Sequence, residues 1–116
     1  MGFFSSDDQK KDGPAELSEK SFGDFLSKGG MAVVMVYMPG CGHCKRMEPA
    51  FQELCEEMTG TATFARINAP ANIVIARRYD VSGTPTVLIF KGGELVKAVV
   101  GELIKEDLRS EIKGSL

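Results

Sequence analysis

The fold of this chain is decided by a nine-residue stretch in which two cysteines follow a turn: Tyr37-Met38-Pro39-Gly40-Cys41-Gly42-His43-Cys44-Lys45. A near-continuous apolar run over residues 32–37 precedes the turn and predicts a central strand that is covered on both faces. Apolar residues at helical spacing follow the turn and predict a helix with one buried face: Met47, Phe51, Leu54, Cys55 and Met58. Pro49 lies inside that helix and should kink it. The cysteines therefore stand where a strand passes into the first turn of a helix.

The position of Cys41 at the start of a helix favours its thiolate, because unpaired backbone N–H groups and the helix dipole stabilise negative charge there. Cys44 lies one turn along on the same side, so the two sulfurs can close a disulfide with little rearrangement. We expect Cys41 to be the exposed nucleophile and Cys44 the more buried thiol that resolves a mixed disulfide. His43 can be protonated near neutral pH, and its imidazolium would lower the pKa of Cys41 further.

A Cys-x-x-Cys pair can instead be half of a zinc site. The other Cys or His residues of the chain are His43 and Cys55. Cys55 lies about 16 Å beyond Cys44 along a helix that rises 1.5 Å per residue, so it cannot complete the same tetrahedron. We expect Cys55 to be a small core residue and the protein to need neither a metal nor another bound cofactor. A metal cluster shared between two chains remains an alternative.

The rest of the pattern predicts one α/β domain over residues 15–116, after a flexible segment over residues 1–14. The order of elements is strand, helix, strand, helix, strand, helix, then a hairpin and a final helix, which calls for a mixed central sheet with helices on both faces. Ser18 should cap the first helix, which stops at Gly29-Gly30. Later elements are a strand over 61–67, a helix over 70–79, strands over 86–90 and 94–100 joined at Gly92-Gly93, and a helix carrying Ile104, Leu108 and Ile112.

The composition is ordinary for a globular domain, with 43% apolar residues, 26% charged residues and a net charge of −2. The absence of a basic stripe argues against nucleic acid as a partner, and no apolar run approaches the roughly 20 residues of a membrane span. No secretory signal is visible, so we expect a cytoplasmic monomer without a membrane partner. Met1-Gly2 with Ser6 loosely fits an N-myristoylation pattern that is common by chance.

On these residues the chain resembles the thioredoxin superfamily, from about residue 15 to the C-terminus. A second motif, Val81-Ser82-Gly83-Thr84-Pro85-Thr86, looks like the cis-proline loop that packs against the cysteines in that family. The resemblance implies that Cys41, His43 and Cys44 are catalytic. It also implies that substrate contacts Gly40, Gly42, Thr84 and Pro85, with strand-like pairing at the Thr84 backbone. Taken alone, Thr84-Pro85 would be expected to be trans.

The tetrapeptide Cys41-Gly42-His43-Cys44 is similar to that of protein disulfide isomerases. We therefore predict a midpoint potential less negative than the roughly −270 mV of a reductive thioredoxin. Two positions depart from the family pattern, and a third lacks its usual partner. Gly40 replaces the usual Trp, Met35 replaces a buried acid, and Arg66 stands where a basic partner of that acid often lies. We expect slower release of the mixed disulfide without the acid, and an Arg66 that is bonded elsewhere.

The function we predict is that of a thiol–disulfide oxidoreductase, which reduces or exchanges disulfides in protein substrates through Cys41 and Cys44. Electrons would come from another dithiol or a reductase, and neither nucleotide-binding motif, G-x-G-x-x-G or G-x-x-x-x-G-K-[ST], is present. Two alternatives remain. One is a glutaredoxin-like reductase that takes electrons from glutathione, and the other is a non-catalytic binding module with the same fold.

Overall fold

A computed structural model describes residues 13–116 of the chain. Most of the predicted flexible segment, and the N-myristoylation pattern, lie outside these described residues. The elements follow the predicted order: β1 (Ala15–Leu17), α1 (Glu19–Ser27), β2 (Met31–Tyr37), α2 (Gly42–Glu57), β3 (Ala62–Asn68), the short 3-10 helix η2 (Pro70–Asn72), α3 (Ile73–Arg78), β4 (Thr86–Lys91), β5 (Glu94–Val100) and α4 (Lys105–Lys113).

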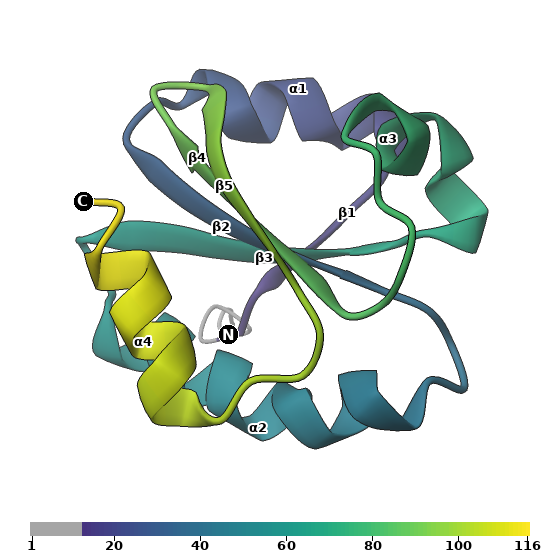
Figure 1. The fold of residues 1–116 in the computed structure, drawn as a ribbon. Coiled ribbons are helices and arrows are strands. Elements are labelled where there is room, and N and C mark those ends of the chain that lie inside the picture. The colour runs from purple at the N-terminus through teal and green to yellow at the C-terminus, as the bar shows by residue number, and fades with distance from the viewer. Residues whose placement is uncertain (1–12) are drawn as a thin grey trace, which may run out of the picture.

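The five strands form one mixed sheet in the order β1-β3-β2-β4-β5. β1, β3 and β2 run parallel, whereas β4 pairs antiparallel with both β2 and β5. Helices α1 and α3 cover one face of the sheet, and α2 and α4 cover the other (Figure 1). This arrangement confirms the predicted mixed sheet with helices on both faces.

The position of β2 in the middle of the sheet explains why its sequence is almost continuously apolar. Val33 and Met35 point into the core cluster shared with α2 and α4, whereas Ala32, Val34 and Val36 point into the cluster shared with α1 and α3. Each of these five side chains is at most 4% exposed. Both faces of the strand are therefore buried, and both alternating sets of side chains must be apolar.

Local signals in the sequence set several element ends. Ser18 caps α1 through a capping box in which the Ser18 hydroxyl accepts from the Ser21 N–H and the Ser21 hydroxyl accepts from the Ser18 N–H. Gly92 and Gly93 have φ values of +60° and +86°, as the tight turn between β4 and β5 requires. These two predictions are confirmed.

Two predicted helices differ from the structure. The helix predicted over residues 70–79 is broken at Asn72, whose φ and ψ are −138° and 56°. The buried Asn72 side chain donates to the Asn68 carbonyl and accepts from the Glu19 N–H, so its hydrogen bonds hold a non-helical backbone. Ile104 is the N-cap of α4 and not a core residue of that helix, and it is 68% exposed.

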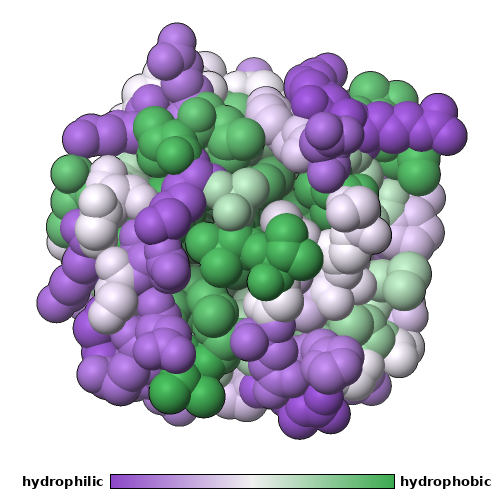
Figure 2. Space-filling model, viewed as in Figure 1, coloured by the Kyte–Doolittle hydropathy of each residue, from purple (hydrophilic) through white to green (hydrophobic). Residues whose placement is uncertain are grey.

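The edge strand β5 carries an exposed apolar band. Figure 2 shows hydrophobic side chains down the middle of the face on which β5 lies, with hydrophilic side chains on both sides. The exposed large apolar residues in this part of the chain are Leu95, Val96, Val100 and Ile104. Among residues 13–116, no helix has both the length and the apolar character to cross a membrane.

Candidate active site

Cys41 is the N-cap of α2, as predicted from its place between a strand and a helix. Its Sγ accepts a hydrogen bond from the Cys44 backbone N–H at 3.2 Å. The Thr84 hydroxyl also donates to this sulfur, at 3.6 Å. When Cys41 is protonated, its thiol can donate to the Thr84 carbonyl at 3.8 Å. Two hydrogen-bond donors therefore face this sulfur, which suits a thiolate.

The two cysteines have opposite pKa shifts, although they lie three residues apart. Hydrogen bonds from the Cys44 thiol and the Thr84 hydroxyl, followed by the backbone N–H groups of Cys44 and His43, hold the pKa of Cys41 below its ordinary value. Burial, followed by the interaction with Cys41, raises the pKa of Cys44. Cys44 is 1% exposed, and Cys41 is partly exposed. This difference suits an attacking thiolate at Cys41 and a protonated, protected thiol at Cys44.

The loop at Thr84 and Pro85 lies beside Cys41, although 43 residues separate Thr84 from it along the chain. The Thr84–Pro85 peptide bond is cis. The loop is held by the Thr86 hydroxyl, which donates to the Gly83 carbonyl, and by the Gly101 N–H, which donates to the Pro85 carbonyl at 2.8 Å. The second motif is therefore brought to the first by the pairing of β4 with β2 and β5.

His43 is placed beside Cys41, but its imidazole bonds away from the sulfur. The ring Nδ1 lies 2.9 Å from Glu102 Oε1 and 2.8 Å from Arg46 Nη2. The side chain is 65% exposed. The backbone N–H of His43 contributes to the low pKa of Cys41. An effect of the imidazolium charge on Cys41 stays a prediction.

The backbone of the turn before Cys41 explains why a glycine, Gly40, occupies the position where the family usually has Trp. The Cys41 N–H donates to the Met38 carbonyl at 3.1 Å and closes a turn with Pro39 and Gly40 as its central residues. Gly40 has a φ of +83°, which a side chain disfavours, whereas Pro39 fits the preceding position of such a turn. Gly42, on the other side of Cys41, begins α2, and a Cβ there would lie 3.5 Å from Arg46 Nη1.

An apolar pocket of about 350 Å³ opens next to the Thr84 loop. Its lining includes Met38 from the turn before Cys41, Ile73 from α3, and Val81 and Thr84 from the loop itself. Met38 and Ile73 are 46% and 48% exposed. The sulfur of Cys41 therefore lies near a surface that can bind an apolar side chain of a substrate.

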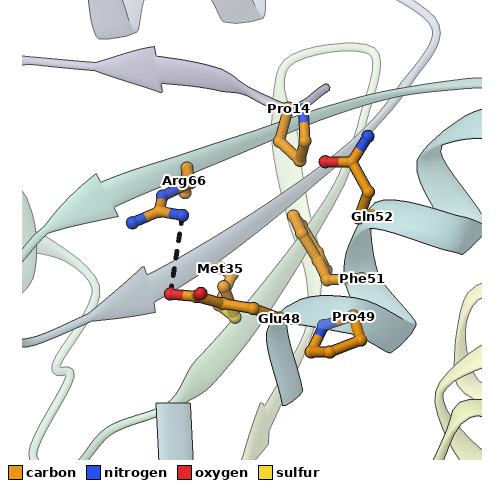
Figure 3. Close-up of a pocket in the computed structure, with 7 residues that line it drawn as sticks. All are labelled: Pro14, Met35, Glu48, Pro49, Phe51, Gln52 and Arg66. Carbon is orange, nitrogen blue, oxygen red and sulfur yellow. Dashed lines mark ion pairs between the residues drawn. The ribbon is translucent and has the colours of Figure 1, made fainter. Parts of the chain in front are cut away.

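A second cavity, of about 260 Å³, lies where the family's buried acid is missing. Figure 3 shows Met35 from β2, Arg66 from β3 and Glu48 from α2 around it, with Glu48 turned toward Arg66. Arg66 Nη1 lies 3.6 Å from Glu48, and Arg66 Nε lies 3.0 Å from Glu16. The guanidinium also stacks 4.2 Å above the ring of Tyr37. The prediction that Arg66 is bonded elsewhere is confirmed.

Cys41 and Cys44 are free thiols, and Cys55 packs against the core cluster under α2, as predicted for a small core residue. Within residues 13–116, no three His, Cys, Asp or Glu side chains are grouped so that they could hold a metal ion.

Sequence reasoning missed Glu102, which binds the first turn of α2 through both His43 and Arg46. Glu102 lies 59 residues from His43, in the segment between β5 and α4. Its neighbours in sequence carry no motif that marks it. Gly101, whose N–H donates to the Pro85 carbonyl, is the residue next to Glu102 that could have indicated that this segment lies against the site.

Comparison with known proteins agrees with this geometry. Residues 13–114 match the family model of thioredoxin. Protein disulfide isomerase-like 1-3 of Arabidopsis thaliana is 32% identical over 99 residues, which are 85% of this chain and 17% of that protein, so the chain spans about a sixth of its length. The solved structure of a mutant thioredoxin from Halobacterium salinarum NRC-1 is 28% identical. It superposes with a TM-score of 0.83 over 93% of this chain and 95% of that one. The chain therefore belongs to the thioredoxin family and is a thiol–disulfide oxidoreductase domain of it.

Proposed function

We propose that the protein exchanges disulfides with protein substrates through Cys41 and Cys44, in the manner of a disulfide isomerase or oxidant more than of a reductive thioredoxin. The observation that carries the proposal is the arrangement of the two thiols. The Cys41 sulfur is partly exposed and accepts hydrogen bonds from the Cys44 N–H and the Thr84 hydroxyl, whereas Cys44 is 1% exposed. A low pKa at Cys41 stabilises the reduced form, which makes the disulfide a better oxidant. The tetrapeptide Cys41-Gly42-His43-Cys44 supports the same direction.

The reaction consists of two exchange steps. The Cys41 thiolate attacks one sulfur of a substrate disulfide, a Cys41–substrate bond forms, and the other substrate sulfur leaves as a thiolate. Cys44 then loses its proton and attacks Cys41 Sγ, which releases the second substrate sulfur and leaves a Cys41–Cys44 disulfide. The substrate gains two electrons and the protein loses two. Run in reverse, the same steps place a disulfide in a dithiol substrate.

The substrate is proposed to lie as an extended segment along the Thr84 backbone, between Gly40 and the Thr84–Pro85 loop. Its apolar side chain would enter the pocket lined by Met38, Ile73 and Val81. Pairing with backbone gives affinity for many sequences, and the pocket adds a preference for apolar residues near the attacked cysteine. Because Gly40 carries no side chain, this surface lacks the large aromatic that the family usually places there.

The exchange chemistry also bears on the source of electrons. The dithiol needs no bound cofactor, because electrons arrive by exchange with another dithiol or a reductase. We propose that the protein works as a monomer in the cytoplasm, where Cys-x-x-Cys pairs are typically catalytic. Net reduction of substrates requires a continuous supply of electrons from a donor, whereas isomerisation does not. The midpoint potential of the Cys41–Cys44 pair limits which donors can reduce it.

Trapping distinguishes this function from the alternatives. Cys44→Ser should accumulate a mixed disulfide with insulin on Cys41, visible by mass spectrometry and reversed by dithiothreitol. Cys41→Ser should trap nothing, and the matched control Cys55→Ser should turn insulin over at the wild-type rate. A glutathione adduct with no insulin adduct would favour a glutaredoxin-like reductase, and the absence of both would favour a binding module.

The midpoint potential of the Cys41–Cys44 pair tests the direction of exchange. Titration against glutathione buffers should give a value well above about −270 mV. A value at or below this would assign the protein as a reductase, with the fold overriding the effect of the tetrapeptide.

A further inference from the structure

The start of α2 carries two basic residues and no acid. Lys45 and Arg46 follow Cys41 within five residues, with His43 beside them, and no acidic residue lies in the first turn of the helix. The helix dipole already places partial positive charge at this end. Cations here add to the field that stabilises the Cys41 thiolate, so their net charge bears directly on how oxidising the disulfide is.

Glu102 contacts the side chains of both His43 and Arg46. Its Oε1 lies 2.9 Å from His43 Nδ1 and 3.1 Å from Arg46 Nε, and its Oε2 lies 3.3 Å from the same Arg46 nitrogen. The carboxylate is partly shielded, with 33% of its side chain exposed. The hydrogen bond from His43, followed by that from Arg46, holds the pKa of Glu102 below its ordinary value. Glu102 is therefore a negative charge held against the turn that follows Cys41.

We propose that Glu102 is a positioning residue of the dithiol, which holds His43 and Arg46 together and offsets the charge of Arg46. The inference deepens the proposed exchange function, since it concerns the potential at which the same pair works. A carboxylate at this place opposes the positive field on Cys41. The Cys41–Cys44 disulfide is then a weaker oxidant than it would be if only the tetrapeptide and the helix dipole acted on Cys41.

The direction of the effect follows from the charge. Removing the carboxylate leaves Arg46 without its counter-charge, so the Cys41 thiolate and the reduced form become more stable. A partly exposed charge that acts over one helical turn changes such an equilibrium by about fivefold. At 29.6 mV per tenfold change, a fivefold shift corresponds to about 20 mV.

The test is a set of three variants, each titrated against glutathione. Glu102→Gln keeps the shape but not the charge, and should raise the midpoint by about 20 mV and speed iodoacetamide alkylation of Cys41 near neutral pH. Glu102→Asp keeps the charge and should stay near wild type. Glu106→Gln removes an acid from α4 that pairs with Arg109, and should leave the midpoint unchanged.

An unchanged or lower midpoint in Glu102→Gln overturns the inference, and so does an equal shift in Glu106→Gln, which would reflect net charge alone. Thermal unfolding of the three variants should be similar, because a purely structural role would move stability and not potential. The glutathione titration reads the cysteine pair directly. It therefore decides the role of Glu102 even if insulin and other protein disulfides prove not to be substrates.

Discussion

Both ends of α2 form ion pairs with the segment that follows β5, but these ion pairs have different consequences at the two ends. At the N-terminal end, the cation Arg46 and the neighbouring His43 meet Glu102. At the C-terminal end the signs are reversed, because Glu53 and Glu57 meet Lys105 and Arg109 of α4. Each end therefore carries the charge that its own dipole disfavours, and each receives its counter-charge from the segment after β5.

The difference lies in what the charges face. Beside the N-terminal end lies a partly exposed sulfur whose protonation the field can change. Under the C-terminal half lie the fully buried side chains of Phe51 and Leu54, which respond to packing and not to charge. The comparison teaches that one helix can separate chemistry from stability, with the redox centre at one end and the main anchoring contacts at the other.

The largest effect is expected where the helix is anchored. Leu54→Ala removes a side chain that is 0% exposed in the core cluster under α2, and should lower the free energy of unfolding by about 2–5 kcal/mol. The midpoint potential should stay within error of wild type. Urea unfolding and a glutathione titration measure the two quantities, with exposed Glu56→Ala as the control. A large change in the midpoint potential would contradict the separation of redox chemistry from stability along α2.

A smaller effect is expected from the turn before Cys41. Gly40→Ala forces a Cβ into a backbone with φ of +83°, and should cost about 1–2 kcal/mol of stability. The matched change Gly42→Ala places a Cβ within α2 against the flexible end of Arg46, and should stabilise by about 0.5 kcal/mol. Urea unfolding of both variants measures the contrast. An equal loss of unfolding free energy in both variants would mean that steric contact of the new Cβ, and not the positive φ of Gly40, determines the effect.

The chemistry of the N-terminal end can be altered without touching α2. Thr84→Val removes the hydroxyl that donates to Cys41 Sγ at 3.6 Å, raises the pKa of Cys41, and should slow its alkylation at pH 7 by about fivefold. Thr84→Ser keeps a hydroxyl and should react nearly as wild type does. Mass spectrometry of iodoacetamide adducts on Cys41 gives the rate. An unchanged rate in Thr84→Val would show that backbone donors alone set this pKa.

The smallest effect is expected from the ion pairs between α2 and α4. Hydrogen bonds from Arg109 and Lys105 lower the pKa of Glu57 from 4.5 to about 2. A depressed pKa in the folded state stabilises the fold above pH 4.5, and this contribution is lost as pH falls from there toward 2. Glu57→Gln should therefore show a slightly lower melting temperature than wild type at pH 6 and the same one at pH 2. A difference that persists at pH 2 would contradict this account.

The fold and the placement of the two cysteines, one exposed at a helix start and one buried, were predictable because their signals are local. The apolar run of β2 requires cover on both faces, and the two motifs around Cys41 and Pro85 mark positions that one sheet brings together. The break at Asn72 was not predictable, because the pattern of residues 70–79 is helical and the hydrogen bond to Glu19 comes from 53 residues away. The partner of His43 was missed for the same reason, since Glu102 meets it only after β5 has paired with β4.

The segment that supplies the counter-charges is also the last part of the domain to leave the ribosome. Leu108 and Ile112 from this segment close the core under α2, and Glu102 reaches the turn beside Cys41. The cysteines are synthesised before the domain is half made, but their surroundings are completed at its end. The surroundings of the cysteine pair are therefore complete only once the segment that carries Glu102, after β5, has been made.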